Sequence, residues 1–523
     1  MAARNGKRAF FWHPLLLGMY SAVALLSANI RQLSAVYGVR PILASLLFSA
    51  LVYGVCALAV RKREKAALIA SLGLLLFFTY GHVYGLLEGA ALWGMVIGRH
   101  LVLMTLWVAV LGLGVFLILR ARSSLGGFNR VLNIASIVLL LIPLAQLSLF
   151  ALQTGSSKTA TMSAATPVAD GAAGLSAGTD APDVYYIILD TYARDDMLQK
   201  YYKLDNTEFI TRLQNLGFYV APCSLSNYSY TPSSLASALN MDYLEEFAGE
   251  IIAGNRSFYD LGDSIKHSRV RRLFESLGYQ TITAETGIWW LEITDSDRFI
   301  TTTGNPWARA FNPGQITNFE LYFLRTTAVR PLDEAGKVLS QRLGKRILTP
   351  ERAHYDSVTY ILDELEHIPS IPGRKFVYIH LIAPHFPYVF SPDGDFEYSP
   401  GNSPGYTNEI LYLNTRFIPL LEEIIQNSAH PPVIILQGDH GMKSEARNAI
   451  LNAYYLPGAS SGVYAAITPV NSFRTVFNVY FDGQFPLLAD YAYSSTYDQP
   501  YQFDPVVDIC NPERLVDSGA PIP

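Results

Sequence analysis

The stretch VIILQGDHGMKSEA (433–446) ends a run of aliphatic residues on a polar pair. Its first residues have the composition of a buried β-strand. Gly438 and Gly441 flank Asp439 and His440, and glycine lets the backbone turn sharply. A strand that ends on a carboxylate beside an imidazole predicts a place where a ligand is held.

Similar strands alternate with helical periods from Asp183 onward. Strands are predicted at VYYIILD (184–190), FYVA (218–221), YQTITAE (279–285), KFVYIHLIA (375–383) and VIILQG (433–438). Helices are predicted at 207–217, 263–278, 353–368 and about 407–426. This alternation predicts an α/β/α sandwich with a mostly parallel sheet. Residues 286–350 do not fit it and are predicted to form an insertion or long loops.

The carboxyl ends of the predicted strands carry the candidate site residues, because open α/β sheets bind ligands at that edge. These residues are Asp190 and Thr191, His380 and His385, and Asp439 and His440. Oxygen and imidazole ligands favour zinc or manganese, with magnesium or calcium as the alternative. We expect Asp190, Asp439 and His440 to bind one such divalent ion. For each residue alone, a helix cap or an ordinary hydrogen bond is the simpler explanation.

The stretch SNYSYTPSSLASALNM (226–241) suggests a nucleophile. Thr231 followed by Pro232 is typical of a helix start, and a helix N-terminus favours a phosphate or sulfate oxyanion. Thr231 is therefore predicted to be a fourth metal ligand and the nucleophile that forms a covalent intermediate. The alternatives are a Thr-Pro pair without chemical role and the rival hydroxyls of Ser229, Ser233 and Ser234.

The first third of the chain is predicted to lie in a membrane. Half of the 523 residues are hydrophobic and only 16% are charged. Five apolar stretches are long enough to span, at about 10–30, 41–60, 66–87, 100–119 and 131–152. Lys and Arg gather at the N-terminus and in the second and fourth connections. The positive-inside rule then places the N-terminus in the cytoplasm and everything after residue 152 outside the inner (plasma) membrane.

These patterns predict a transmembrane domain at 1–152, a flexible linker at 153–182 and a catalytic domain at 183–523. The linker is mostly Ala, Gly, Ser and Thr. The net charge of −5 is spread without long runs, so a nucleic-acid partner is not expected. Of the three cysteines, Cys56 lies in a predicted span, and Cys223 and Cys510 are predicted to form a disulfide in the exported domain.

The order of these motifs resembles the alkaline phosphatase superfamily in its sulfatase-like branch. A strand ending in IILD, a Thr that opens a helix, the segment IHLIAPHFPY (379–388) and GDHG (438–441) follow one another as in that branch. With five spans, the chain is most similar to the membrane-bound lipoteichoic acid synthases and lipid A phosphoethanolamine transferases. The resemblance implies the metal ligands Asp190, Thr231, Asp439 and His440. It also implies that Thr231 is the nucleophile and that His380 and His385 contact the transferred group.

Two departures from the family pattern narrow the chemistry. Cys223 lies in CSLSN, without the Pro and Arg of the C-x-P-x-R signature, so formylglycine-dependent sulfate hydrolysis is disfavoured. The acid and two histidines of a second zinc site are not evident, so one essential metal is expected.

The sequence thus predicts a metal-dependent transferase or hydrolase of a phosphoryl-linked or sulfuryl group. Its substrates would be membrane lipids and cell-envelope glycans or lipids. Two alternatives stay open: a non-catalytic envelope protein that keeps the fold for binding or assembly, and a simple phosphomonoester or sulfate ester hydrolase.

Overall fold

The computed structural model describes residues 11–30, 35–92, 95–96, 98–163, 172, 174–254, 258–302, 317–332, 350–401, 403–459, 462–507 and 510. The chain falls into two compact units. The first comprises Met1–Ala164 and Asn305–Pro350, and the second comprises Ala165–Gly304 and Glu351–Pro523. The first unit thus takes in 305–350, which lies within the segment that the sequence assigned to an insertion or loops.

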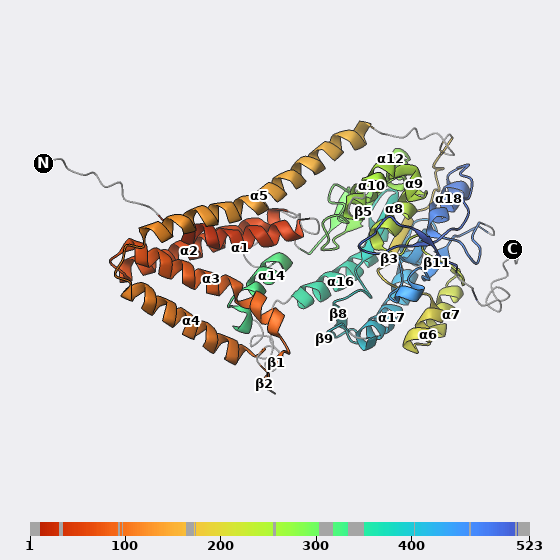
Figure 1. Cartoon of the computed structure of the whole chain (residues 1–523). Helices are drawn as coiled ribbons and strands as arrows, with labels where there is room; N and C mark the ends of the chain where they lie inside the picture. The colour runs from red at the N-terminus through yellow and green to blue at the C-terminus, as the bar shows by residue number, and fades with distance from the viewer. Residues whose placement is uncertain are drawn as a thin grey trace. The chain divides into compact units, whose positions relative to one another are not determined.

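The first unit contains five apolar helices (Figure 1). They are α1 His13–Asn29, α2 Val39–Ala59, α3 Arg63–Leu87, α4 His100–Arg120 and α5 Gly126–Ser163, with a short pair of strands, β1 Ala91–Leu92 and β2 Met95–Val96. In the described part of the chain, four helical segments are long and apolar enough to cross a membrane. Helix α1 has only 17 residues and is not among them, although it occupies the first predicted span.

Helix α5 continues beyond the predicted end of the last span, to Ser163. The beginning of the predicted linker is therefore helical. Extending an existing helix fixes one residue per added hydrogen bond, whereas starting a new one is costly. The apolar span provides that start, so a polar continuation can follow it. Residues 164–171 and 173 of the linker lie outside the described residues.

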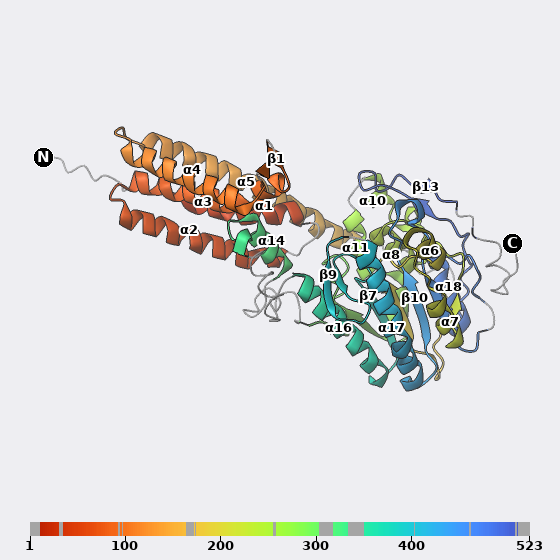
Figure 2. The same ribbon diagram turned by 90° about the horizontal axis from the view of Figure 1, so that it is seen from below.

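Helix α14 (Asn318–Thr326) belongs to the first unit, where Figure 2 shows it beside the helices of the bundle. Its start is fixed by a capping box, in which Thr317 and Glu320 satisfy each other's backbone N–H groups. Phe323 is buried against Phe78, with the ring centroids 5.9 Å apart. Its apolar face explains why this part of the segment is helical and not a loop.

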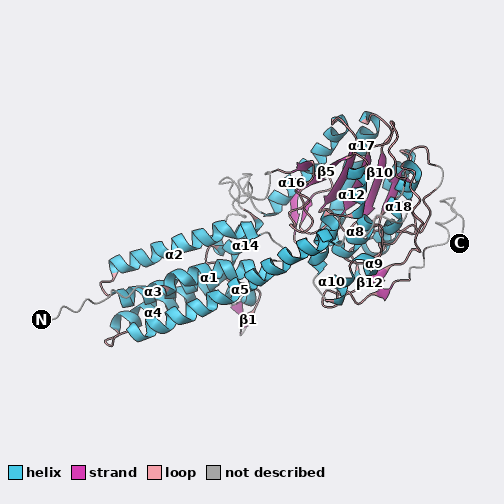
Figure 3. Cartoon of the chain, turned by 90° about the horizontal axis from the view of Figure 1, so that it is seen from above, coloured by secondary structure: helices cyan, strands magenta, loops and turns pink. Residues whose placement is uncertain are grey.

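The second unit is built on a seven-stranded sheet in the order β4-β11-β10-β3-β7-β5-β6 (Figure 3). The strands are β3 Val184–Leu189, β4 Tyr219–Val220, β5 Gln280–Ala284, β6 Arg298–Ile300, β7 Lys375–Leu381, β10 Val433–Gly438 and β11 Asn452–Tyr455. Neighbours from β10 to β6 are parallel, and β11 and β4 add an antiparallel edge. The predicted mostly parallel sheet is confirmed.

Helices cover both faces of this sheet, as the sandwich prediction requires. Alternate residues of β3 point to opposite faces. Tyr185, Ile187 and Leu189 pack in a core with helices α7 (Thr207–Asn215), α16 (Pro350–His367) and α17 (Ser403–Asn427). Val184, Tyr186 and Ile188 pack in a second core with helices α8 (Thr231–Asn240), α12 (Arg269–Ser276) and α18 (Pro469–Tyr480). All six residues of β3 are buried, which accounts for its unbroken apolar sequence.

The remaining short elements of the second unit lie in the connections. They are α6 Asp195–Tyr202, α9 Leu244–Phe247, α10 Gly249–Ala253, α11 Gly262–Lys266, β8 Tyr388–Phe390, β9 Phe396–Ser399, β12 Tyr493–Ser494 and β13 Asp504–Pro505. Single turns of 3-10 helix occur in this unit at Phe258–Leu261, Ile368–Ser370 and Ser444–Ala446, and in the first unit at Ala35–Gly38.

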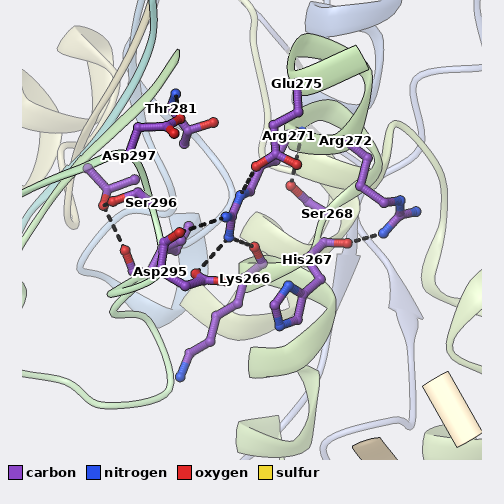
Figure 4. A network of polar contacts seen from close by, with 12 residues as sticks. Lys266, His267, Ser268, Arg271, Arg272, Glu275, Thr281, Asp295, Ser296 and Asp297 are labelled. Carbon is purple, nitrogen blue, oxygen red and sulfur yellow. Dashed lines mark hydrogen bonds and ion pairs between the residues drawn. The ribbon is translucent and has the colours of Figure 1, made fainter. Parts of the chain in front are cut away.

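The prediction of a single helix at 263–278 is wrong, because the chain forms two helices, α11 and α12, with a break between them. Ser268 is extended and its Oγ accepts the Arg271 N–H, which caps α12. Arg271 is buried and binds Glu275 of the same helix (2.6 Å) and Asp295 (2.9 Å), and the contact with Asp295 ties α12 to the loop before β6 (Figure 4). The cap and these tertiary contacts override a continuous helical period.

The predicted disulfide between Cys223 and Cys510 is confirmed, with the Cα atoms 5.5 Å apart. It fastens the chain near its C-terminal end to the segment that follows β4. This segment leads to α8, so the bridge lies on the path to Thr231.

Candidate functional site

Three adjacent strands bring the polar residues of the sequence motifs to one edge of the sheet. In the parallel register, Leu189 of β3 lies beside both Leu381 of β7 and Gly438 of β10. The chain therefore leaves β3 at Asp190 and β10 at Asp439 next to each other. His380 lies one residue before the end of β7. This is the edge at which open α/β sheets bind ligands.

Asp190, His380 and Asp439 form a buried cluster whose candidate ligand atoms lie within 4.8 Å of one another. His380 Nε2 lies 3.2 Å from Asp190 Oδ2. Asp190 Oδ1, Asp439 Oδ2 and His380 Nδ1 are buried without hydrogen-bond partners. Buried polar atoms normally have partners, so these atoms leave room for a ligand. Two carboxylates and imidazoles are a donor set that fits a divalent cation such as zinc or manganese.

The carboxylate of Asp439 is held by backbone donors. Its Oδ1 accepts hydrogen bonds from the N–H groups of Thr191 and His440, both at 2.9 Å. Thr191 has φ 67°, a left-handed conformation that is rare for a β-branched residue. The strain is maintained because Thr191 Oγ1 donates to Pro384 O and Tyr406 Oη donates to Thr191 O. The loop after β3 is thus fixed in a shape that points an N–H group at Asp439.

Gly438 is required by the close approach of that same loop. A Cβ atom at position 438 would lie 2.2 Å from the carbonyl oxygen of Tyr192. Such a contact with backbone atoms cannot be relieved by a side-chain movement. The glycine before the polar pair therefore lets β10 and the loop after β3 meet at the site.

The charge of Asp190 is set by its imidazole neighbours. Burial acts to raise its pKa, but His385, His380 and His440 together lower that pKa well below the ordinary range. Burial lowers the pKa of His440, and Asp439 opposes this shift only in part. An ionised carboxylate beside a neutral imidazole is the protonation state that a cation needs from its ligands.

His440 links the carboxylates to Thr231. Its Nδ1 lies 2.9 Å from Gly441 O, and since a carbonyl oxygen can only accept, Nδ1 carries the proton. Nε2 therefore presents a lone pair, 3.5 Å from Asp439 Oδ2 and 3.1 Å from Thr231 Oγ1. The Thr231 hydroxyl can donate to this nitrogen.

Thr231 is the first residue of α8, as its Thr-Pro sequence predicts. Ser234, on the next turn, donates from Oγ to the Asp439 carbonyl at 2.8 Å and so fastens the helix to the strand end. The hydroxyl of Ser234, one of the alternative nucleophiles, is therefore engaged in a structural hydrogen bond. Of the others, Ser229 Oγ accepts from Ser495 N, and Ser233 Oγ is buried without a partner. Among the described serine and threonine side chains of this segment, Thr231 is the one whose hydroxyl is bonded to the side chain of a candidate ligand.

The structure brings all seven candidate residues to this region, but it groups them differently from the predicted roles. The sequence assigned His440 to the metal and His380 to the transferred group, whereas the tight buried cluster contains His380. His385 is half-buried, and its Nδ1 donates to Phe386 O at 2.7 Å. These assignments of roles stay predictions.

Two further residues near the site were missed from the sequence. His354 of α16 has a buried Nε2 without a partner, and burial together with His385 lowers its pKa to about 4. Arg447 lies 3.5 Å from His440 Nε2. His354 lies in a predicted helix whose sequence shows a helical period, and that period gives no signal for a site. Arg447 lies just beyond the GDHG motif, and its position after a motif was the only available signal.

Comparison with known proteins bears on this site. A model of the Sulfatase family matches residues 182–500, more than half of the chain. No curated protein matches it.

Several solved structures resemble the chain at low sequence identity. The C-terminal periplasmic domain of EptC from Escherichia coli, in complex with Zn, has 12% identity and a TM-score of 0.41, over 63% of this chain and 93% of that one. Lipooligosaccharide phosphoethanolamine transferase A from Neisseria meningitidis, an integral membrane protein, has 12% identity and a TM-score of 0.39, over 90% and 95%. The lipoteichoic acid synthase LtaP from Listeria monocytogenes has 11% identity and a TM-score of 0.33, over 55% and 71%.

Proposed function

Because this chain belongs to the Sulfatase family, we propose that it is a membrane-bound, metal-dependent transferase that moves a phosphoryl-linked head group from a membrane lipid onto an envelope glycan or lipid. The group passes through a covalent intermediate on Thr231. Hydrolysis of the same group, or of a sulfuryl group, is the variant in which water replaces the acceptor.

One observation carries the proposal: the Thr231 hydroxyl is bonded to His440, which adjoins the buried Asp190, His380 and Asp439 cluster. The expected ligands of one divalent ion are Asp190, Thr231, Asp439 and His440. When bound, such an ion supplies positive charge that activates the hydroxyl and neutralises charge on the transferred group.

The residues of the chain perform the remaining tasks. The N-terminus of α8 holds Thr231 where free N–H groups favour an oxyanion. Thr231 Oγ forms a bond to phosphorus as the bond to the lipid alcohol breaks, and the hydroxyl proton leaves with that alcohol. An acceptor hydroxyl or water then attacks phosphorus and returns its proton to Thr231. His380 and His385 contact the transferred group.

The first unit supports a membrane location. Four of its helical segments are long and apolar enough to span a membrane. The distribution of Lys and Arg places the second unit on the periplasmic or extracellular side of the inner membrane. Lipid-borne substrates are therefore accessible to a site in a chain that is itself in the bilayer.

The test is to find the head group on Thr231. The full-length chain in lipid nanodiscs would be loaded with zinc, mixed with phospholipids carrying isotope-labelled head groups, quenched, and analysed by peptide mass spectrometry. We expect the label on the peptide that contains Thr231, and no label in Thr231→Ala, which lacks the nucleophilic oxygen. Thr231→Ala should still bind most of the metal through Asp190, Asp439 and His440.

Ser233→Ala is the matched control, because it removes a hydroxyl from the same helix without removing a described hydrogen bond. It should be labelled as the wild type is. Label on another residue, or equal label in Thr231→Ala, would rule out the proposed intermediate.

A further inference from the structure

Arg447 is a cation beside the candidate nucleophile that the proposed function does not use. Its Nη2 lies 3.5 Å from His440 Nε2. His440 Nε2 also lies 3.1 Å from Thr231 Oγ1. The guanidinium and the hydroxyl therefore share one neighbour and lie close enough for a single tetrahedral anion to contact both.

Two contacts fix the orientation of this guanidinium. Its Nε donates to the carbonyl oxygen of Ser229. Its Cζ lies 4.5 Å from the centre of the Tyr230 ring. Ser229 and Tyr230 immediately precede Thr231, so Arg447 is attached to the loop that positions the nucleophile. A planar guanidinium held at its Nε and by an aromatic face keeps its terminal N–H groups for a ligand.

The Tyr230 ring is in turn supported by aromatic neighbours. It lies 5.1 Å from the Phe258 ring and 5.3 Å from the Tyr497 ring, which it meets edge to face. These rings restrict the movement of Tyr230, and through it that of Arg447. An arginine that is ordered before its ligand arrives loses little conformational entropy on binding.

No carboxylate of the described residues forms an ion pair with the Arg447 guanidinium. Its contacts are a carbonyl oxygen, an imidazole nitrogen and an aromatic face, and no ion pair includes it in that part of the chain. Other buried or half-buried arginines of this unit are paired, such as Arg271 with Asp295 and Arg416 with Asp363. A positioned guanidinium without a carboxylate, next to a helix N-terminus, is suited to an anion with several oxygens.

We propose that Arg447 binds a non-bridging oxygen of the tetrahedral oxyanion that Thr231 takes up, a phosphoryl or sulfuryl group. This assignment rests on the proposed function for the identity of the group, and it adds a specificity-determining residue to the site. The ligand class is an anion with at least two free oxygens, one for the guanidinium and one for the other groups around Thr231. Neutral esters would not be recognised.

The test measures binding of inorganic phosphate to the zinc-loaded full-length chain by isothermal titration calorimetry. All proteins would carry Thr231→Ala, so that no covalent step contributes. We expect Arg447→Ala to weaken phosphate binding by about tenfold to a hundredfold, as expected for loss of a charge-assisted hydrogen bond. Arg447→Lys should recover part of the loss, because it keeps the charge but not the planar fork.

Lys443→Ala is the matched control. Lys443 is an exposed cation in the same loop, near the Tyr202 ring and four positions before Arg447. Its removal should leave phosphate affinity unchanged, which separates a local contact from the general loss of one positive charge. Metal content and circular dichroism would show that the variants are loaded and folded.

Equal phosphate affinity in the parent and Arg447→Ala proteins would overturn the inference, as would absence of phosphate binding to the parent. Equal loss in Lys443→Ala and Arg447→Ala would also overturn it. Failure of the proposed function is a separate result, since it would appear as an unlabelled Thr231 in the lipid experiment. Phosphate binding that depends on Arg447 would survive that failure.

Discussion

Two regions of the second unit each bury a carboxyl group, yet the two groups differ in protonation. Asp190 at the end of β3 and Glu409 in α17 are both buried, and each has one oxygen without a hydrogen-bond partner. Burial raises the pKa of Glu409 to about 8, although the N–H groups of Val389 and Phe390 lower it somewhat. The pKa of Asp190 is instead held well below its ordinary value.

The difference lies in the neighbours and not in the depth of burial. Imidazoles of His385, His380 and His440 surround Asp190, whereas Glu409 Oε1 accepts a backbone N–H of Val389 at 2.6 Å. A buried carboxyl group without imidazole neighbours keeps its proton and acts as a structural group. One that stays ionised beside imidazoles and a second carboxylate is suited to a cation. Burial alone therefore does not mark a functional acid.

The largest expected effect comes from replacing Asp439, the second carboxylate of the site that contains Asp190. Asp439→Asn should lower turnover by about a thousandfold or more, because a metal ligand and its negative charge are lost. Turnover of labelled lipid by purified protein measures this. Glu409→Gln is the matched control and should keep wild-type turnover. A fully active Asp439→Asn protein would show that the glycine-flanked pair is only a turn.

A smaller effect is expected from removing one of the imidazoles that favour the charge of Asp190. His385→Ala should bind metal normally and lower turnover by about tenfold to a thousandfold, because the transferred oxyanion is stabilised less well. Metal content and single-turnover kinetics measure the two quantities separately. His367→Ala, at the end of α16, is a suitable control for loss of a histidine. Unchanged turnover in His385→Ala would remove this residue from the site.

The smallest effect, on stability alone, concerns Glu409. Its folded pKa of about 8 lies above its ordinary value of 4.5, so between these values the folded state holds a proton that the unfolded state has lost. Stability should therefore fall as pH rises through this window, by at most about 1.4 kcal/mol per pH unit. Glu409→Gln should remove this slope. Unfolding of the detergent-solubilised chain from pH 5 to 8 measures it, and parallel profiles for the two proteins would contradict the protonated Glu409.

The central strands and their polar ends were predictable from local sequence. β3, β7 and β10 are buried on both faces, so their sequences are mostly apolar, although β7 contains Lys375 and His380. β3 and β10 end directly before Asp190 and Asp439. Parallel strands share a carboxyl edge, which is sufficient to bring these residues together. The order of the motifs identified the sulfatase-like family, and the family match confirms it.

Features that depend on tertiary contacts were not predictable. The break before α12 depends on Asn240, whose Oδ1 accepts the Arg269 N–H from another helix. The place of α14 depends on the fit of Phe323 against helices about 250 residues earlier in the chain. The positions of His354 and Arg447 near the site follow from packing that no spacing rule encodes.

The metal content of the purified full-length chain tests the central claim most directly. Wild type, Asp190→Asn and Glu409→Gln would be incubated with zinc or manganese, freed of excess metal and analysed by mass spectrometry of the elements. We predict about one ion per chain in the wild type and Glu409→Gln, and loss of that ion in Asp190→Asn, because Asp190 is a proposed ligand and Glu409 is not. Equal metal in all three proteins, or none in the wild type, would contradict the assignment of the strand ends as a metal site.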